Sequence, residues 1–199
     1  MSELALLLSG GMDSIALAWA LKPSLAITID YGQMPAAGEI RAAAAVCTSL
    51  GIRHRIVRAD CTEVGSGDLI GRSADPLAPS SEWWPYRNQL LITLAASAAI
   101  QEGLTRLAFG AVSTDGSHVD GRSEFFQALN QVLGLQEGRL TVETPAIEQT
   151  TVEFCRRVQV PFDILAWSHS CHAAEYACGN CRGCNKHRQC MRELGYGDY

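Results

Sequence analysis

The stretch LALLLSGGMDS occupies residues 4–14 and indicates the architecture of the whole chain. Its leading apolar residues favour a buried β-strand, the paired glycines permit a tight turn, and Asp13 to Leu21 continue as a helix. A helix N-terminus offers free N–H groups and the positive end of a dipole, so a glycine turn here favours phosphate binding. Two glycines between a strand and a helix also occur in ordinary turns, and a turn without a ligand is the alternative.

Apolar runs and helical segments alternate along the chain downstream of this turn. No lysine follows the glycines and they are not spaced as GxGxxG, so the turn differs from two common nucleotide-binding loops. The alternation predicts an α/β fold with a doubly wound parallel sheet. Strands are expected at 24–29, 53–57, 106–111 and 139–142, and helices at 38–50, 89–102, 124–133 and 148–158.

Two segments depart from this alternation. Residues 65–84 are rich in Gly, Ser, Pro and Asp and predict a long loop that is functional or mobile. Beyond Phe162, aliphatic residues become sparse while Cys, His, Gly and Arg accumulate. We therefore expect an α/β domain over residues 1–162 and a small metal-binding subdomain over 163–199.

Four of the eight cysteines follow the spacing C-x6-C-x2-C-x2-C. Two overlapping CxxC turns can bring three thiolates to one ion, and the preceding cysteine completes the tetrahedron that Zn²⁺ prefers. A site with four thiolates has no open position, which indicates a structural role. The spacing also permits an iron–sulfur cluster, or reduced cysteines without metal. The four candidate ligands are Cys171, Cys178, Cys181 and Cys184.

Composition narrows the classes of function. The 199 residues carry a formal net charge of -5, which argues against a nucleic-acid partner held by a general basic field. Only two residues, Lys22 and Lys186, are lysines. No apolar run reaches membrane-spanning length, and the first residues lack the basic start of a signal peptide. These features predict a cytoplasmic protein without membrane contact.

The order SGGxDS resembles the PP-loop of the ATP pyrophosphatase superfamily. The resemblance implies that ATP and Mg²⁺ are used and that AMP and pyrophosphate are released. The chemistry is then adenylation of a carboxyl or amide oxygen, followed by attack of a nitrogen nucleophile. Asp13 would position magnesium or the loop itself. The residues implied to bind nucleotide are Leu8, Ser9, Gly10, Gly11, Met12, Asp13, Ser14 and Ile15.

Over nearly its whole length the chain resembles the QueC family of 7-cyano-7-deazaguanine synthases. Five blocks coincide in order: SGGMDS, YGQ followed by Glu39, the pair Arg87-Asn88, FGAVSTDGSHVDGRSEFF, and WSHSC with CGNCRGC. The resemblance implies a homodimer that converts 7-carboxy-7-deazaguanine and ammonia, with ATP, into 7-cyano-7-deazaguanine.

The resemblance also assigns roles to individual residues. Asp13, Ser14, Arg87 and Asn88 would be catalytic, and the four cysteines would bind structural zinc. Arginine suits a planar carboxylate, and aspartate accepts hydrogen bonds from guanine-type N–H groups. The implied substrate-binding residues are Tyr31, Gln33, Arg87, Asp115, Asp120 and Arg122. Without the family, the last three could form a surface loop with an ion pair.

Two departures from the family pattern leave alternatives open. The segment DGSHVDGR stands where the family has a pattern like DYSGYPDCR, and Thr150-Thr151 stands where the family usually has a Thr-Lys pair. A cation expected near the phosphates is therefore absent from that position. One alternative is a relative that transfers the activated acyl group to another amine, including one on a protein. Another is a tRNA-modifying PP-loop enzyme.

Overall fold

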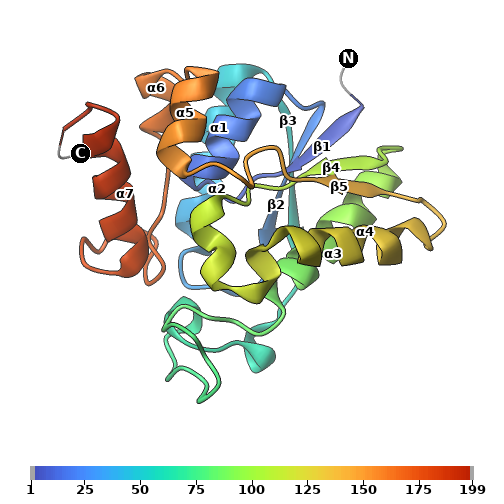
Figure 1. Cartoon of the computed structure of the whole chain (residues 1–199), viewed down its shortest axis with the longest axis horizontal. Coiled ribbons are helices and arrows are strands. Elements are labelled where there is room, and N and C mark those ends of the chain that lie inside the picture. Colours follow the sequence, from blue (N-terminus) through green and yellow to red (C-terminus); the bar gives the residue numbers. More distant parts are fainter. Residues whose placement is uncertain (1–2, 198–199) are drawn as a thin grey trace.

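Five parallel strands form the central sheet of the computed structural model, which describes residues 3–197 (Figure 1). Their order is β3-β2-β1-β4-β5, which confirms the predicted doubly wound α/β class. Within the described residues, every helix is too short or too polar to cross a bilayer. The strands are β1 (Leu4–Leu7), β2 (Leu25–Asp30), β3 (Arg53–Arg58), β4 (Arg106–Ala108) and β5 (Thr141–Glu143).

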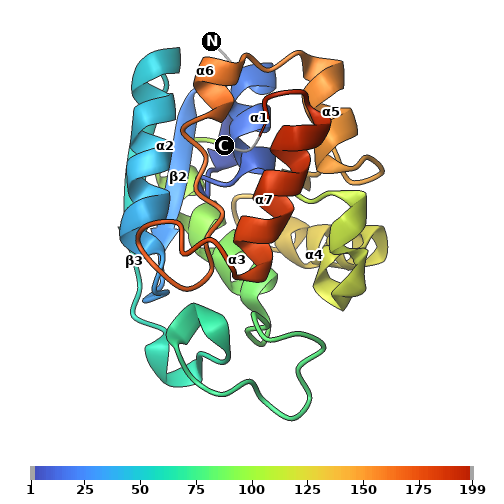
Figure 2. The ribbon, with the colours of Figure 1, turned by 90° about the vertical axis from the view of Figure 1, so that its left-hand side faces the viewer.

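Helices cover both faces of this sheet (Figures 1 and 2). All the predicted helices are present with bounds shifted by up to three residues, whereas α6 and α7 were not predicted. The helix α7 carries few aliphatic residues, so its sequence lacks an apolar stripe. The helices are α1 (Met12–Leu21), α2 (Ala36–Leu50), α3 (Arg87–Gln101), α4 (Ser123–Gly134), α5 (Thr151–Val158), α6 (Phe162–Leu165) and α7 (Arg182–Glu193). Four 3-10 turns lie in the loops: η1 (Thr62–Val64), η2 (Asp68–Ile70), η3 (Ser113–Ser117) and η4 (Val119–Gly121).

The two faces of β1 divide the core into two layers. Leu4 and Leu6 pack with α1, α2, α5 and α6, whereas Ala5 and Leu7 pack with α3 and α4. Side chains alternate across a strand, so one fully apolar strand can serve both layers. This double burial explains why β1 is apolar at every position rather than at every second one.

The strand order reverses between β1 and β4. These two strands are paired, with Leu6 opposite Ala108, and the chain leaves them toward opposite edges of the sheet. Ligands of open α/β sheets bind outside the carboxyl ends of the strands at such a point. The glycine turn follows β1 here, and Gly110 follows β4. A Cβ on Gly110 would lie 3.3 Å from the Ser14 nitrogen, so this glycine permits the two loops to touch.

The C-terminal segment returns to this same edge of the sheet (Figure 2). The backbone N–H of His169 donates to the Gly10 carbonyl at 2.8 Å. On α7, Cys190 and Met191 are buried in the layer that α1 and α5 share. The division of the chain after residue 162 stays a prediction, but α7 belongs to the core of the α/β body.

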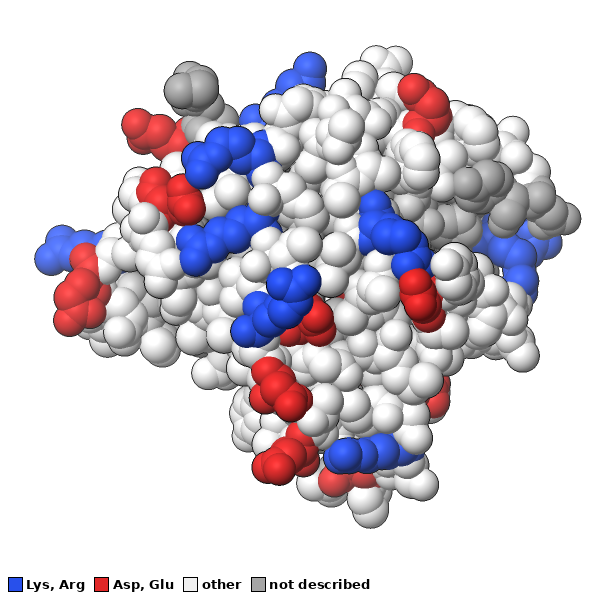
Figure 3. Space-filling model, turned by 180° about the vertical axis from the view of Figure 1, so that it is seen from behind, with Lys and Arg blue, Asp and Glu red and all other residues white. Residues whose placement is uncertain are grey.

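Acidic and basic side chains are interspersed over the face shown in Figure 3. Several surface arginines are held in ion pairs: Arg53 with Glu102 at 2.8 Å, and Arg106 with Glu143 at 2.6 Å. Paired charges of this kind do not form the basic stripe that tracks a nucleic-acid backbone.

Candidate active site

A cavity of about 330 Å³ opens at the carboxyl ends of β1, β2 and β4. This volume lies within the range of small-ligand sites. Leu7, Ile29 and Phe109 at the strand ends form its floor. Its walls come from the glycine turn, from residues 82–91, from the loop after β4, and from the C-terminal segment.

The glycine turn forms one wall through a compact network of short contacts. Gly10 has φ +79°, and a Cβ there would lie 2.7 Å from the Glu39 carbonyl oxygen, so only glycine fits. The Ser9 and Ser14 hydroxyls are 3.2 Å apart, and the Gly11 N–H donates to Ser9 Oγ at 3.4 Å. The first turn of α1 begins at Met12, directly above this network. The turn therefore aims hydroxyls and a helix N-terminus at one point.

The structure brings most of the predicted nucleotide-binding residues to the cavity. Ser9, Gly11, Met12, Asp13 and Ser14 line it, whereas Leu8, Gly10 and Ile15 lie beneath. The buried Leu8 and Ile15 anchor the turn to the core.

Asp13 is the acidic residue of this turn. Its Oδ2 lies 3.7 Å from Lys186 Nζ, and its Oδ1 is buried without a hydrogen-bond partner in the described part of the chain. Burial raises the pKa of Asp13, while the charge of Lys186 opposes that shift. Lys186 Nζ also lies 3.6 Å from Asp115 Oδ1. Two carboxylates with an unused oxygen suit a hard divalent cation.

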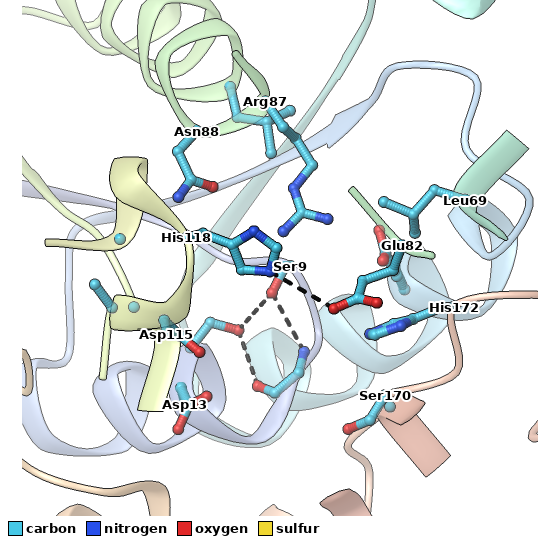
Figure 4. Close-up of a pocket in the computed structure, with 18 of the residues that line it drawn as sticks. Ser9, Asp13, Leu69, Glu82, Arg87, Asn88, Asp115, His118, Ser170 and His172 are labelled. Carbon is cyan, nitrogen blue, oxygen red and sulfur yellow. Dashed lines mark hydrogen bonds and ion pairs between the residues drawn. The ribbon is translucent and has the colours of Figure 1, made fainter. Parts of the chain in front are cut away.

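Arg87 and Asn88 open α3 on the opposite wall. In the view of Figure 4, Asp13 and Asp115 lie on one side of Ser9, and Arg87, Glu82 and His172 on the other. The Asn88 backbone N–H donates to Asp120 Oδ2 at 3.3 Å, and its side chain donates to the Asp120 carbonyl at 3.0 Å. Asp120 therefore fixes the start of α3 and with it the place of Arg87.

The six predicted substrate residues divide between the cavity wall and its surroundings. Tyr31 lines the cavity and packs edge-on against Trp84, with ring centroids 4.9 Å apart. Gln33 lies outside the lining, where its amide donates to Glu39 at 2.7 Å and accepts from the Tyr31 N–H at 2.9 Å. Arg122 also lies outside the lining and donates to the Gly116 carbonyl at 2.9 Å. Gln33 and Arg122 therefore support neighbouring loops, and Arg87, Asp115 and Asp120 line the cavity with Tyr31.

Glu39 gives the site a pH dependence. Burial raises its pKa to about 7, although the Gln33 amide and the Arg87 charge oppose the shift. Because this folded-state pKa exceeds that of an unfolded glutamate, the folded protein holds the extra proton, and its stability falls as pH rises from about 4.5 to 7. We expect a loss on the order of 2 kcal/mol, or roughly 5 °C in Tm.

The Glu39→Gln variant is expected to lose this slope, because the new amide oxygen still accepts from Gln33 but does not ionise. Thermal unfolding between pH 5 and pH 7.5 measures the effect. The exposed Glu137→Gln is the matched control and should keep the wild-type slope. Equal slopes in wild type and Glu39→Gln would contradict the assignment.

Sequence reasoning missed Glu82, a buried acid in the long loop. Its Oε1 accepts from Arg182 at 2.6 Å and lies 3.6 Å from His118 Nε2, while its Oε2 is buried without a described partner. Burial opposes ionisation of Glu82, yet hydrogen bonds and the Arg182 charge together hold its pKa below the ordinary value. The only signal in the sequence is an acid directly before two tryptophans in a polar loop.

The four predicted cysteines form a second cluster beside the cavity. Their sulfur atoms all lie within 4.8 Å of one another, with Cys178 to Cys184 and Cys171 to Cys181 both at 3.9 Å. Four sulfurs about 2.3 Å from one ion would lie about 3.8 Å apart, so this arrangement fits a tetrahedral site. Backbone N–H groups of Asn180 and Cys181 lower the pKa of Cys178 to about 6, which favours the thiolate.

This cluster joins the two segments that carry the C-terminal wall of the cavity. Cys171 closely follows His169, whose N–H is bonded to the glycine turn. Cys181 caps the N-terminus of α7 by accepting from the Cys184 N–H, and Lys186 lies in the next turn. A metal held by these sulfurs would therefore brace the active-site wall without entering it.

The strand order, the SGGxDS turn at the switch point and the nearby four-cysteine cluster define a PP-loop α/β protein. A family model described as "Queuosine biosynthesis protein QueC" matches residues 3–195, and the chain belongs to this family. It is similar to the 7-cyano-7-deazaguanine synthase of Desulforudis audaxviator, with 32% identity over 95% of this chain and 96% of that protein. The synthase of Acidobacterium capsulatum is 34% identical over 89% of this chain and 86% of that protein. The synthase of Chlorobaculum tepidum is 31% identical over 97% of this chain and 93% of that protein.

Proposed function

We propose that this protein is an ATP-dependent 7-cyano-7-deazaguanine synthase acting on 7-carboxy-7-deazaguanine and ammonia. The observation that carries the proposal is a single cavity with a phosphate-type turn on one wall and Arg87 with Glu82 on the other. Relatives that match over most of their length and are named for this product support the proposal.

The proposed reaction consumes two ATP molecules. A carboxylate oxygen of the substrate attacks the α-phosphorus, the bond to the β-phosphate breaks, and pyrophosphate leaves. Ammonia attacks the acyl adenylate, AMP leaves, and a proton is lost to give the amide. The amide oxygen then attacks a second ATP in the same way. AMP departs with that oxygen, and the nitrogen loses two protons to give the nitrile.

The residues of the cavity fit these steps. The turn of Ser9 and Gly11 and the start of α1 would hold the phosphates, and the Arg87 guanidinium would orient the substrate carboxylate. Orientation of this kind converts a bimolecular attack into a local one. Asp120 keeps Arg87 in place through Asn88.

Two metals accompany the proposal. Mg²⁺ would screen the phosphate charge when bound, and the free Asp13 Oδ1 offers it a ligand. Zn²⁺ would occupy the cysteine cluster, because the close sulfur spacing fits one ion better than a cluster with several irons between its ligands. The zinc would be structural, since four thiolates saturate it.

Mass spectrometry of a reaction with purified protein, ATP, Mg²⁺, 7-carboxy-7-deazaguanine and ammonia tests the proposal. We expect the nitrile, with two AMP formed per nitrile. AMP without nitrile, or an acyl group transferred to another amine, would contradict it. Dependence of AMP formation on added RNA would contradict it as well.

Glu82→Gln is expected to weaken recognition of the deazaguanine. The free carboxylate oxygen can accept from the N–H edge of a guanine-type ring, whereas an amide presents a donor to the same edge. We expect the KM for the substrate to rise about 10- to 100-fold with little change in the KM for ATP.

The exposed Glu124→Gln is the matched control for charge. An unchanged substrate KM in Glu82→Gln would rule out this role. Equal rises in both KM values would show that Glu82 shapes the cavity as a whole, and would rule it out too.

A further inference from the structure

Lys186 reaches the active site from a part of the chain remote from the glycine turn. It lies on α7, two residues after Cys184, and its side chain is 41% exposed. In the described part of the chain, the lysine and arginine residues that line the cavity are Arg87, Arg182 and Lys186. The position of Lys186 on this wall was not predicted from the sequence.

Lys186 forms ion pairs with two acidic residues. Its Nζ lies 3.7 Å from Asp13 Oδ2 and 3.6 Å from Asp115 Oδ1. Asp13 belongs to the first turn of α1, whose N-terminus faces the same space. A phosphate bound by the N–H groups of this helix would therefore come within reach of the lysine.

The other two cavity cations serve different places. Arg182 is bonded to Glu82 at 2.6 Å. Arg87 opens α3 and lies near Tyr31 and Glu39, whose pKa values its charge lowers against the effect of burial. Near the glycine turn, the wall formed by α5 contributes only the neutral Thr151, which is 2% exposed and has an unpartnered Oγ1.

We propose that Lys186 is a phosphate-binding residue that pairs with the ATP polyphosphate and takes the place of a cation at Thr151. This inference rests on the use of ATP in the proposed function. Without nucleotide, Asp13 and Asp115 hold the ammonium group beside the turn. When ATP binds, the ammonium group exchanges these carboxylates for phosphate oxygens, and the carboxylates become free to ligate a divalent cation.

Chemical labelling of lysine tests the contact directly. Lys22 is the other lysine of the sequence and serves as an internal reference. Lys22 follows α1 at its far end and lies over the Trp19 ring. The protein is acetylated briefly with and without Mg-ATP, and both lysines are quantified by mass spectrometry. ATP is expected to slow acetylation of Lys186 at least about fivefold and to leave Lys22 unchanged, whereas adenosine protects neither.

Calorimetry of ATP binding distinguishes the role of Lys186 from the use of ATP by the protein. Saturating ATP without protection of Lys186 would overturn the role of the lysine and leave the proposed function standing. Absence of ATP binding to the wild-type protein would overturn both.

Variants test the energetic role. Lys186→Met is expected to weaken ATP binding about 10- to 100-fold, the effect of losing one charge-assisted contact. Its affinity for adenosine and its metal content should stay at wild-type values. Lys22→Met is the matched control and should bind ATP normally.

A second substitution supplies the charge from α5, the helix that packs beside α7. Lys186→Met with Thr151→Lys should recover most of the lost ATP affinity, because residue 151 lines the same cavity. Wild-type ATP binding by Lys186→Met would overturn the proposal. Weaker adenosine binding or loss of metal in the single variant Lys186→Met would also overturn the proposal, because either result would indicate a purely structural role for Lys186.

Discussion

Asp13→Asn is expected to lower AMP formation at least about 100-fold and to leave the fold intact. Asp13 lines the cavity beside the glycine turn, and one of its carboxylate oxygens is buried without a described partner. An amide there supplies neither the charge nor the same ligand for a divalent cation. Burial raises the pKa of Asp13, so its ionised form costs stability at neutral pH. The asparagine should therefore keep or raise the Tm.

Release of pyrophosphate from ATP in the presence of 7-carboxy-7-deazaguanine measures the effect. Ser14→Ala should show a loss in the same direction, because the Ser14 hydroxyl joins Ser9 and the Gly11 carbonyl in the turn. The matched control is Asp163→Asn, an exposed acid in α6. Unchanged pyrophosphate release in Asp13→Asn would remove the glycine turn from the reaction.

Local patterns predicted much of the fold because they act over short distances. The apolar run of β1 followed by two glycines and Asp13 allows only a buried strand, a tight turn and a helix start. The same locality explains the cysteine cluster, since Cys178, Cys181 and Cys184 are separated by two residues each. In these segments, the residues that make a contact are also neighbours in sequence.

The missing parts of the site depend on contacts between distant segments. Glu82 lies in a loop without periodicity, and its importance depends on Arg182 of α7. Lys186 lies on a helix too polar to predict, and packing of Cys190 and Met191 into the core helps to bring it to Asp13. The cation absent at Thr151 is therefore supplied by a segment that no local pattern connects to the glycine turn.

Removal of the metal from the cysteine cluster is expected to lower both stability and ATP affinity. Structural metal sites contribute their binding energy to folding, so Cys178→Ser should lose about 3 kcal/mol or more, roughly 10 °C in Tm. The ATP effect follows from geometry. The cluster joins the segment of His169, which is bonded to the Gly10 carbonyl, to the helix that carries Lys186.

Metal analysis, thermal unfolding and ATP calorimetry on the same samples separate these effects. Cys61→Ser, a cysteine outside the cluster, should keep its metal, its Tm within about 2 °C and its ATP affinity. A protein freed of metal by chelation, with wild-type Tm, would contradict the structural role. Normal ATP binding after metal loss would instead show that the glycine turn and α7 hold their places without the cluster. Weakened ATP binding that returns when Zn²⁺ is restored would show that the metal acts on the active site through protein segments. The metal could not bind ATP directly, because sulfur atoms already fill its four coordination positions.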